Sequence, residues 1–357
     1  MLSLSQILGD VSGAHRQSPE DWARSLTRAV RDAALHHHAR NGYYRAQCEV
    51  AGVDPAMVHG LDDLRHLPLL PVGLLRRPEA HLLLTCSLAE VETETRVPGP
   101  GGASPVVRRN AETETRTLIG LTGTYREFLG LSGGAGLFLG PPARVLTVLH
   151  GVLDHHVDLD DDAGDPEPAA DQLRRWQGGP VRHVLGPGPL VRRLVRSLAD
   201  TATTVRLDPY SMVITLGGRT RSPEAAGEAE AFRDRCHDRL GVRRENVREV
   251  YAMAESSLLA VECQVHRKHV PPWCHVSARD PDDVRTEVAP GASGVIAVLD
   301  ALNTSYPGFL LSEDVGAVET GTCPCGRTGQ VLVVHGRRQG PEQARGTRSL
   351  EEYLAAG

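Results

Sequence analysis

The sequence predicts an α/β fold whose second half is richer in strands than its first half. Segments with apolar residues at helical spacing alternate with short apolar runs bounded by turn residues. A length of 357 residues allows about two domains, or one large domain with an appendage. The hydrophobic fraction of 40% and the charged fraction of 24% are ordinary for a globular protein.

Three segments have the pattern of amphipathic helices. The first, residues 18–50, begins with Ser-Pro-Glu-Asp, the second covers about 112–131, and the third, 222–241, is capped and ends at a glycine. The first contains His36, His37 and His38, which point in different directions on a helix and so make a poor metal cage. We expect them to be ordinary surface or half-buried side chains.

Short apolar runs predict the strands, and two other segments are predicted to form an extended crossing and a loop. Prolines at 68 and 71 favour an extended crossing, and the acidic, Pro/Gly-rich segment 154–171 is predicted to be a solvated loop without an EF-hand pattern. The predicted strand regions are 143–153, 211–218, 247–256, 294–302, 308–320 and 330–338.

Composition argues against several classes of protein. A net charge of −6, no basic stripe and 4% aromatics argue against nucleic acid as a partner. The N-terminus lacks the pattern of a signal peptide, and no run approaches the length of a membrane span. Seven scattered cysteines fit a reducing cytoplasm, where we expect the protein to reside. Lys268 is the only lysine, so a mechanism that needs a lysine has one candidate.

The stretch Thr-Cys-Pro-Cys-Gly-Arg, residues 322–327, places Cys323 and Cys325 one residue apart. Upstream, Cys263-Gln-Val-His266-Arg-Lys-His269 offers one thiol and two imidazoles. One of these histidines with the three cysteines would make a closed Cys₃His set, as in structural zinc sites. Spacing alone leaves open that the cysteines are simply buried thiols.

Several motifs occur in a specific order in the second half of the chain. They are Val-Tyr251-Ala-Met-Ala-Glu255-Ser, then Ser-Tyr-Pro, Ser-Glu-Asp314-Val-Gly, Cys-x-Cys-Gly-Arg and a closing Gly-Arg337. This order resembles the acyl-protein synthetase (LuxE) family of the adenylate-forming superfamily, which is related to the phenylacetate–CoA ligases. The resemblance covers nearly the whole chain and is strongest over residues 250–338.

The resemblance implies a large N-terminal domain of the adenylate-forming type, with mixed sheets flanked by helices. This core would cover residues 1–338, with a zinc-braced second half of about 247–338. Residues 339–357 would be a short remnant of the C-terminal domain. The expected reaction is attack of a carboxylate on the ATP α-phosphate, followed by transfer of the acyl group to a thiol or an amine.

The resemblance also implies roles for individual residues. Tyr251 would lie against adenine, Glu255 would hold Mg²⁺, and Asp314 and Arg337 would contact the nucleotide, with Glu255 and Arg337 acting in catalysis. In the related phenylacetate-type ligases, a Cys-x₅-His pair and a Cys-x-Cys pair bind zinc, which selects His269 over His266 here. The residues expected to approach the nucleotide are Gly99, Gly102, Gly217 and Gly218. The expected zinc ligands are Cys263, His269, Cys323 and Cys325.

Three departures from the family pattern concern the chemistry. The segment aligned with the Ser/Thr-rich phosphate loop, 97–105, reads Val-Pro-Gly-Pro-Gly-Gly-Ala-Ser-Pro, so it has lost most hydroxyls and its prolines lack N–H donors. The superfamily's C-terminal lysine has no counterpart. Segment 345–349 has no cysteine where the acyl-protein synthetases carry one, which excludes an acyl-cysteine there, and Thr347 is a weak nucleophile.

Three functions therefore follow from the sequence. The first is an ATP-dependent acyl-activating enzyme of bacterial specialised metabolism, which passes a small carboxylic acid to a carrier-protein thiol, CoA or an amine. The second is an ATP-independent acyltransferase or cyclase that acts on a preformed acyl thioester. The third is a non-catalytic partner of an acyl carrier. Retention of Glu255, Asp314 and Arg337 favours the first, and the altered segment 97–105 favours the others.

Overall fold

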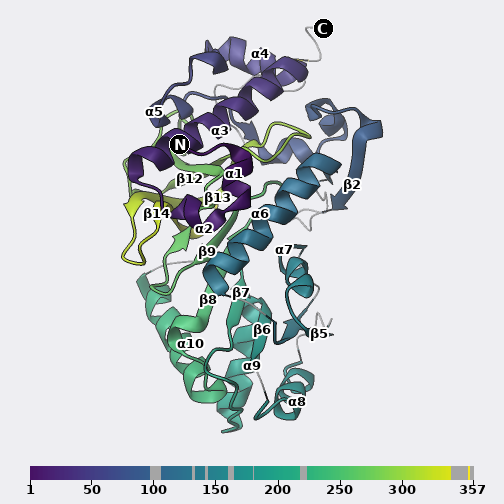
Figure 1. Cartoon of the computed structure of the whole chain (residues 1–357), viewed down its shortest axis with the longest axis vertical. Coiled ribbons are helices and arrows are strands. Elements are labelled where there is room, and N and C mark those ends of the chain that lie inside the picture. Colours follow the sequence, from purple (N-terminus) through teal and green to yellow (C-terminus); the bar gives the residue numbers. More distant parts are fainter. Residues whose placement is uncertain are drawn as a thin grey trace. The chain divides into compact units, whose positions relative to one another are not determined.

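The computed structural model describes residues 1–96, 106–130, 133–140, 144–159, 165–179, 181–217, 223–338 and 353. Figure 1 labels many of the helices and strands along the chain. The chain divides into two compact units. The first unit contains Met1–Gly120, Met253–Leu258 and Val270–Gly357, and the second contains Leu121–Ala252 and Leu259–His269.

The first unit is built on an antiparallel sheet in the order β11-β12-β13-β14, to which the short β1 adds in parallel beside β13. Its α-helices are α1 (Leu4–Gly9), α2 (Val11–His15), α3 (Pro19–Arg40), α4 (Gly42–Ala51), α5 (Leu61–Leu64) and the start of α6 (Ala111–Leu129). Its strands are β1 (Leu70–Pro71), β2 (Val91–Arg96), β3 (Val106–Asn110), β11 (Cys274–Arg279), β12 (Gly294–Asp300), β13 (Phe309–Thr322) and β14 (Thr328–Arg337). The 3₁₀ turns are η1 (Pro55–Met57), η2 (Val72–Arg76), η3 (Pro78–Leu83) and η4 (Leu88–Glu90).

Helix α3 covers one face of this sheet. Its apolar stripe, which includes Leu26 and Val30, packs against Leu299 and Phe309 in one continuous core. Because side chains alternate along a strand, Leu310 faces the other way and joins a second cluster with residues of η2 and η3. Strands β2 and β3 form a separate antiparallel pair.

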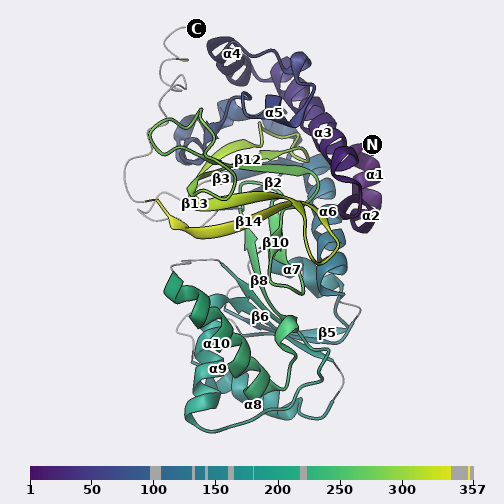
Figure 2. The same ribbon diagram turned by 90° about the vertical axis from the view of Figure 1, so that its left-hand side faces the viewer.

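The second unit is a mostly parallel sheet with helices packed on it. Strand order is β5-β4-β6-β7-β8-β9-β10, with β9 and β10 antiparallel to their neighbours. Helices α8, α9 and α10 pack together on one face of the sheet (Figure 2), where their apolar side chains and those of the strands form one core. The elements are β4 (Ala135–Leu139), α7 (Arg144–Thr147), η5 (Val148–Gly151), β5 (His155–Leu159), α8 (Glu167–Arg175), β6 (Arg182–Pro187), α9 (Gly188–Asp200), β7 (Val213–Leu216), α10 (Pro223–Leu240), η6 (Arg244–Asn246), β8 (Val247–Ala252), β9 (Leu259–Glu262) and β10 (Lys268–His269).

The predicted α/β class is confirmed, and most predicted elements form near their expected positions. The helical segment 18–50 is divided at Asn41. The Oδ1 atom of Asn41 accepts a 2.7 Å hydrogen bond from the N–H of Tyr44, while its own N–H donates to the carbonyl of His37 over 2.8 Å. Asn41 therefore ends α3 and caps α4.

Two predictions of local structure are wrong. Residues 144–151 form α7 and η5 rather than a strand, because the buried side chains Leu146, Leu149 and Leu153 recur every three or four residues, as on a helix. The expected loop 154–171 contains strand β5 and the first part of α8. Strand β5 escapes prediction because it is an edge strand with mostly exposed polar side chains.

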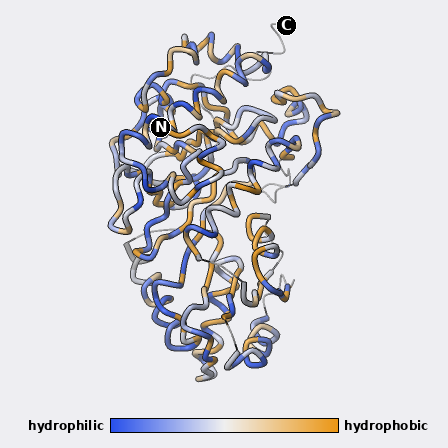
Figure 3. The backbone as a smooth tube through the Cα atoms, in the orientation of Figure 1, coloured by the Kyte–Doolittle hydropathy of each residue, from blue (hydrophilic) through white to orange (hydrophobic). Residues whose placement is uncertain are grey.

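Within the described residues, no helix is long and apolar enough to cross a membrane. The long helices carry both hydrophilic and hydrophobic residues along their length (Figure 3). This is the pattern of helices that bury one stripe against a protein core.

Candidate functional site

Two β-hairpins end in turns of the same form. In the turn between β9 and β10, the N–H of Cys263 donates to the carbonyl of Arg267 (3.0 Å) and the N–H of His266 donates to Cys263 (2.8 Å). In the turn between β13 and β14, Cys323 donates to Arg327 and Gly326 to Cys323, both over 2.8 Å. Each turn thus carries a cysteine at its first position.

The fourth residue of each turn has positive φ, which is 55° at His266 and 86° at Gly326. This left-handed conformation closes a three-residue hairpin loop and is easy for glycine but uncommon for histidine. In the first turn, therefore, His266 occupies the left-handed position that a glycine, Gly326, fills in the second turn. Its Nδ1 lies 3.5 Å from Oε2 of Glu262.

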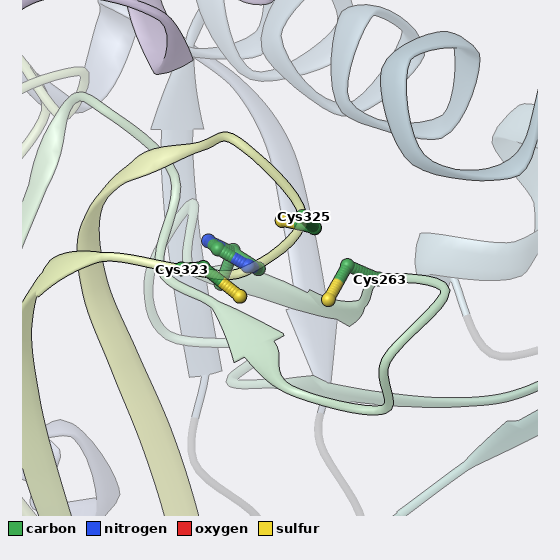
Figure 4. A group of neighbouring side chains, drawn as sticks. Cys263, Cys323 and Cys325 are labelled. Carbon is green, nitrogen blue, oxygen red and sulfur yellow. The ribbon is translucent and has the colours of Figure 1, made fainter.

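Four potential metal ligands lie close together at these hairpins. The ligand atoms of Cys263, His269, Cys323 and Cys325 all lie within 4.8 Å of one another, and Figure 4 shows the three cysteine side chains gathered there. Cys263 and His269 are each 1% exposed, and Cys323 is 4% exposed. The group contains His269 and not His266, as the family pattern implies.

A buried charge network supports the β9–β10 hairpin. The ammonium of Lys268 lies 2.6 Å from Oε2 of Glu249 and 3.5 Å from Oε1 of Glu262. Nη2 of Arg233 lies 3.6 Å from Oε2 of Glu262. The same Oε2 atom accepts a 3.0 Å hydrogen bond from the backbone N–H of Glu249. Although burial alone would raise it, the pKa of Glu262 is lowered to about 2 by His266 and by the cations Lys268 and Arg233.

Glu255 lies in the first unit, in a loop whose backbone is held by the buried carboxylate of Asp300. Asp300 accepts hydrogen bonds from the N–H of Ser257 (2.7 Å), its hydroxyl (2.5 Å) and the N–H of Leu302 (2.9 Å). The hydroxyl of Tyr306 also donates to the carbonyl of Glu255 over 2.5 Å. The loop backbone is therefore fixed at Glu255 and Ser257.

Charged groups surround the Glu255 side chain. Burial raises the pKa of Glu255, the guanidinium groups of Arg76 and Arg109 lower it, and the carboxylate of Asp314 raises it. Arg109 also donates a hydrogen bond to the carbonyl of Ala254 in the same loop. A half-buried carboxylate beside two arginines and a second carboxylate is suited to bind a metal ion and phosphate groups together.

Glu313 connects the remaining predicted residues. It forms ion pairs with both Arg76 and Arg337, and its carbonyl accepts a 2.7 Å hydrogen bond from the N–H of Arg338. Asp314 is paired in register with Arg337 across β13 and β14, next to a β-bulge. The N–H of Asp314 donates to the hydroxyl of Ser312 over 3.0 Å. The first unit thus brings Glu255, Asp314 and Arg337 into one charged region.

The other predicted nucleotide residues are placed separately. Tyr251 is buried in β8, and Gly217 follows β7, where its N–H donates to the carbonyl of Val250 over 3.1 Å. Gly217 has a φ of 97°, which favours glycine. Gly99, Gly102 and Gly218 lie outside the described residues, as do segments 97–105 and 345–349.

Sequence reasoning missed the roles of Arg76, Glu313, Tyr306 and Asp300. Arg76 and Glu313 are 237 residues apart, so no local pattern reports their ion pair. Tyr306 lies in the Ser-Tyr-Pro motif, and Glu313 precedes Asp314, so their positions were a usable signal.

Comparison with known families is consistent with these motifs. A family model described as acyl-protein synthetase, LuxE, matches residues 189–355. Two curated relatives are long-chain-fatty-acid–luciferin-component ligases, from Aliivibrio fischeri and Vibrio harveyi. They are 23% and 25% identical over 320 residues, covering 84% of this chain and 82% of each relative. The predicted resemblance to the acyl-protein synthetases is confirmed.

Solved structures confirm the fold class. An open conformation of 2-hydroxyisobutyryl-CoA ligase matches with a TM-score of 0.70 and 15% identity, covering 91% of this chain and 76% of that chain. A long-chain-fatty-acid-CoA ligase from Archaeoglobus fulgidus matches with a TM-score of 0.51 and 15% identity, over 69% of this chain and 51% of that chain. The fold is that of the adenylate-forming ligases.

Proposed function

We propose that this chain, an acyl-activating ligase of the LuxE acyl-protein synthetase type, uses ATP to adenylate a carboxylic acid and then transfers the acyl group to an acceptor. The observation that carries the proposal is the convergence of Glu255, Asp314 and Arg337 in one charged region of the first unit. Their motifs lie far apart in the sequence. A shared nucleotide site explains why two carboxylates and an arginine from separate motifs lie in one region.

In the proposed reaction, a carboxylate oxygen of the acid attacks the α-phosphorus of ATP. The bond from that phosphorus to its bridging oxygen breaks, and pyrophosphate leaves with the electron pair. A thiol or amine then attacks the carbonyl carbon of the acyl-adenylate, and AMP leaves. Both steps require positioning and neutralisation of phosphate charge more than proton transfer.

The residues present fit the proposed cofactors. Glu255 offers a half-buried carboxylate for Mg²⁺, which when bound would neutralise phosphate charge. Asp314 and Arg337 would contact ribose and phosphate, and Tyr251 and Gly217 would approach the base. Three thiols and one imidazole, largely buried and close together, suit Zn²⁺ in a closed structural site.

The substrate class follows from the relatives' names. Both curated relatives are ligases for long-chain fatty acids, so we expect an aliphatic carboxylic acid here. The acceptor is a carrier-protein thiol, CoA or an amine. A place in bacterial specialised metabolism, and the location of the protein in the cytoplasm, stay predictions from the sequence.

A second function has its own supporting observation. Segment 97–105 has one hydroxyl side chain, Ser104, and three prolines, so its sequence is poor in groups that bind phosphate. This favours an ATP-independent acyltransferase or cyclase that takes a preformed acyl thioester. A non-catalytic partner of an acyl carrier is the third alternative.

Pyrophosphate exchange separates these functions. Wild-type protein is incubated with MgATP, labelled pyrophosphate and a panel of fatty acids from short to long chains, and calorimetry measures ATP binding in parallel. We expect acid-dependent label in ATP, reduced about a hundredfold or more in Glu255→Gln. No ATP binding by the wild type would sink the proposal. Turnover of an acyl-carrier thioester without ATP would support the second function.

A further inference from the structure

Arg109 is a buried cation that makes one hydrogen bond. Its side chain is 3% exposed, and its Nη2 donates one hydrogen bond, to the carbonyl of Ala254. Among the residues that the structure describes, no carboxylate lies within ion-pair distance of its guanidinium. A guanidinium has five N–H donors, so a single backbone acceptor leaves most of its hydrogen-bonding capacity unused.

A buried guanidinium without a direct ion-pair partner is costly, and proteins rarely retain one without a use. The neighbours of Arg109 indicate what that use is. It lies close enough to Glu255, Tyr306 and Asp300 to lower the pKa of each. Arg109 therefore faces the loop that presents Glu255, the carboxylate expected to hold Mg²⁺.

We propose that Arg109 is an anion-binding residue of this site and that its guanidinium binds a phosphoryl oxygen of the nucleotide. This inference deepens the proposed function and rests on it. An arginine presents paired donors in a plane, which match the oxygens of a phosphate. It supplies fixed positive charge in a site whose cation cannot be a lysine of this chain.

Two observations favour an arginine of this part of the chain as a source of charge. The only lysine, Lys268, is 4% exposed and paired with Glu249 and Glu262. Segment 97–105, which directly precedes β3, has lost the hydroxyls expected of a phosphate loop. Arg109 lies on β3, four residues after that segment ends, so it replaces lost polar contacts from the same part of the chain.

The adjacent residue provides a matched control. Arg108 lies on the opposite face of β3, and its Nε is 2.6 Å from Oε1 of Glu94. Its charge is thus paired and directed away from the face that carries Arg109. Arg108→Gln changes the net charge by the same amount as Arg109→Gln without changing the proposed site.

The test compares Arg109→Met and Arg109→Gln with wild type and Arg108→Gln, using calorimetry with MgATP and pyrophosphate exchange. We expect both Arg109 variants to lose about tenfold to a hundredfold in ATP affinity, while the KM for the fatty acid stays unchanged. Arg108→Gln should match the wild type. Wild-type ATP affinity in the Arg109 variants, or an effect confined to the acid, would overturn the inference.

Thermal unfolding distinguishes binding from a structural role. Because Arg109 has no ion-pair partner and makes one backbone hydrogen bond, Arg109→Met should lower the melting temperature by only a few degrees. A large fall in melting temperature with ATP affinity retained would instead show that Arg109 only braces the Ala254 loop. Arg109→Gln keeps an N–H donor for Ala254 and decides the matter if the methionine variant does not fold.

Failure of the proposed function is separable from failure of this inference. If wild-type protein does not bind MgATP, the adenylation proposal fails, and inorganic pyrophosphate is then used alone as the probe in thermal shift. We expect pyrophosphate to raise the melting temperature of the wild type and Arg108→Gln, but not of the Arg109 variants. No shift in the wild type, or equal shifts in all four proteins, would overturn the anion site.

Discussion

His37 is the fully buried member of three adjacent histidines on α3, and both of its ring nitrogens have partners. Nδ1 lies 2.9 Å from Oγ1 of Thr85, and Nε2 lies 3.0 Å from the carbonyl of Asn303. Burial, followed by the charge of His36, lowers the pKa of His37 to about 3. The ring of His37 in the folded protein is therefore neutral at neutral and mildly acidic pH.

This lowered pKa makes stability depend on pH. His37 stays neutral in the folded state but takes up a proton in the unfolded chain below its ordinary pKa of 6.5. Its contribution is present above pH 6.5 and is lost as the pH falls from 6.5 towards 3, by roughly 1.4 kcal/mol per pH unit. We expect His37→Gln to be less stable at pH 7.5 and to lose less stability between pH 6.5 and 4.5.

Urea unfolding at several pH values measures this difference. His38→Gln is the control, because His38 is the next residue on the same helix and its side chain is half-buried. The control should keep the wild-type pH dependence. Equal slopes for all three proteins would contradict the assignment of His37 as a neutral, buried group.

The histidine triplet also shows where sequence reasoning ends at the level of one residue. The sequence excludes a metal cage, since three consecutive helical residues diverge. It does not indicate which of the three is buried, and the expectation of ordinary surface or half-buried side chains is wrong for His37. Its burial depends on Thr85 and Asn303, which are 48 and 266 residues away.

At the scale of elements, the two cysteine turns carry the clearest prediction of metal binding. Cys323→Ser removes one of three thiols from the group of four potential ligands, so we expect it to lose roughly one zinc ion per chain and to unfold at lower temperature. Metal analysis by mass spectrometry and thermal unfolding with and without a chelator provide the measurements.

A buried cysteine outside the cluster gives the matching control. Cys274 in β11 is 1% exposed and does not belong to the ligand group. Cys274→Ser should lose stability through its buried hydroxyl while keeping its zinc. Well-folded wild-type protein without metal, which a chelator does not destabilise, would refute the zinc site.

Elements were predictable where one signal determines them. Cysteines and a histidine at fixed spacing indicated the group of four potential ligands, and a motif at the end of a predicted strand indicated the position of Glu255. The hairpin of β9 and β10 was not predicted. Residues 144–151 were not predictable as a helix, because a short apolar run fits a strand or a helix until its buried positions are known. The roles of Arg76 and Arg109 depend on contacts made across more than a hundred residues.

At the scale of the whole chain, the contact pattern gives two units of discontinuous sequence. The expected boundaries, a core of 1–338 and a remnant of 339–357, follow the family pattern and stay a prediction, since of residues 339–357 only Tyr353 is described. Insertion of 253–258 into the first unit explains why sequence order alone could not locate the units. That short insertion is the loop that carries Glu255.

The single lysine allows a prediction about the entire molecule. Lys268 is 4% exposed, and its ammonium is held by Glu249 and Glu262, so an amine-reactive reagent should not reach it in the folded state. We expect native protein treated with a succinimidyl ester to gain one label, at the N-terminal amine. Protein treated in denaturant should gain a second label, at Lys268.

Intact-mass and peptide mass spectrometry distinguish the two products, and the labelled native protein can be assayed directly. Since no free lysine serves the proposed reaction, labelling under native conditions should leave pyrophosphate exchange unchanged. Lys268→Arg, denatured and labelled, controls for the second site. Modification of Lys268 in native protein, or inactivation that tracks its modification, would show that this lysine is accessible to substrates and that arginines are not the site's only cations.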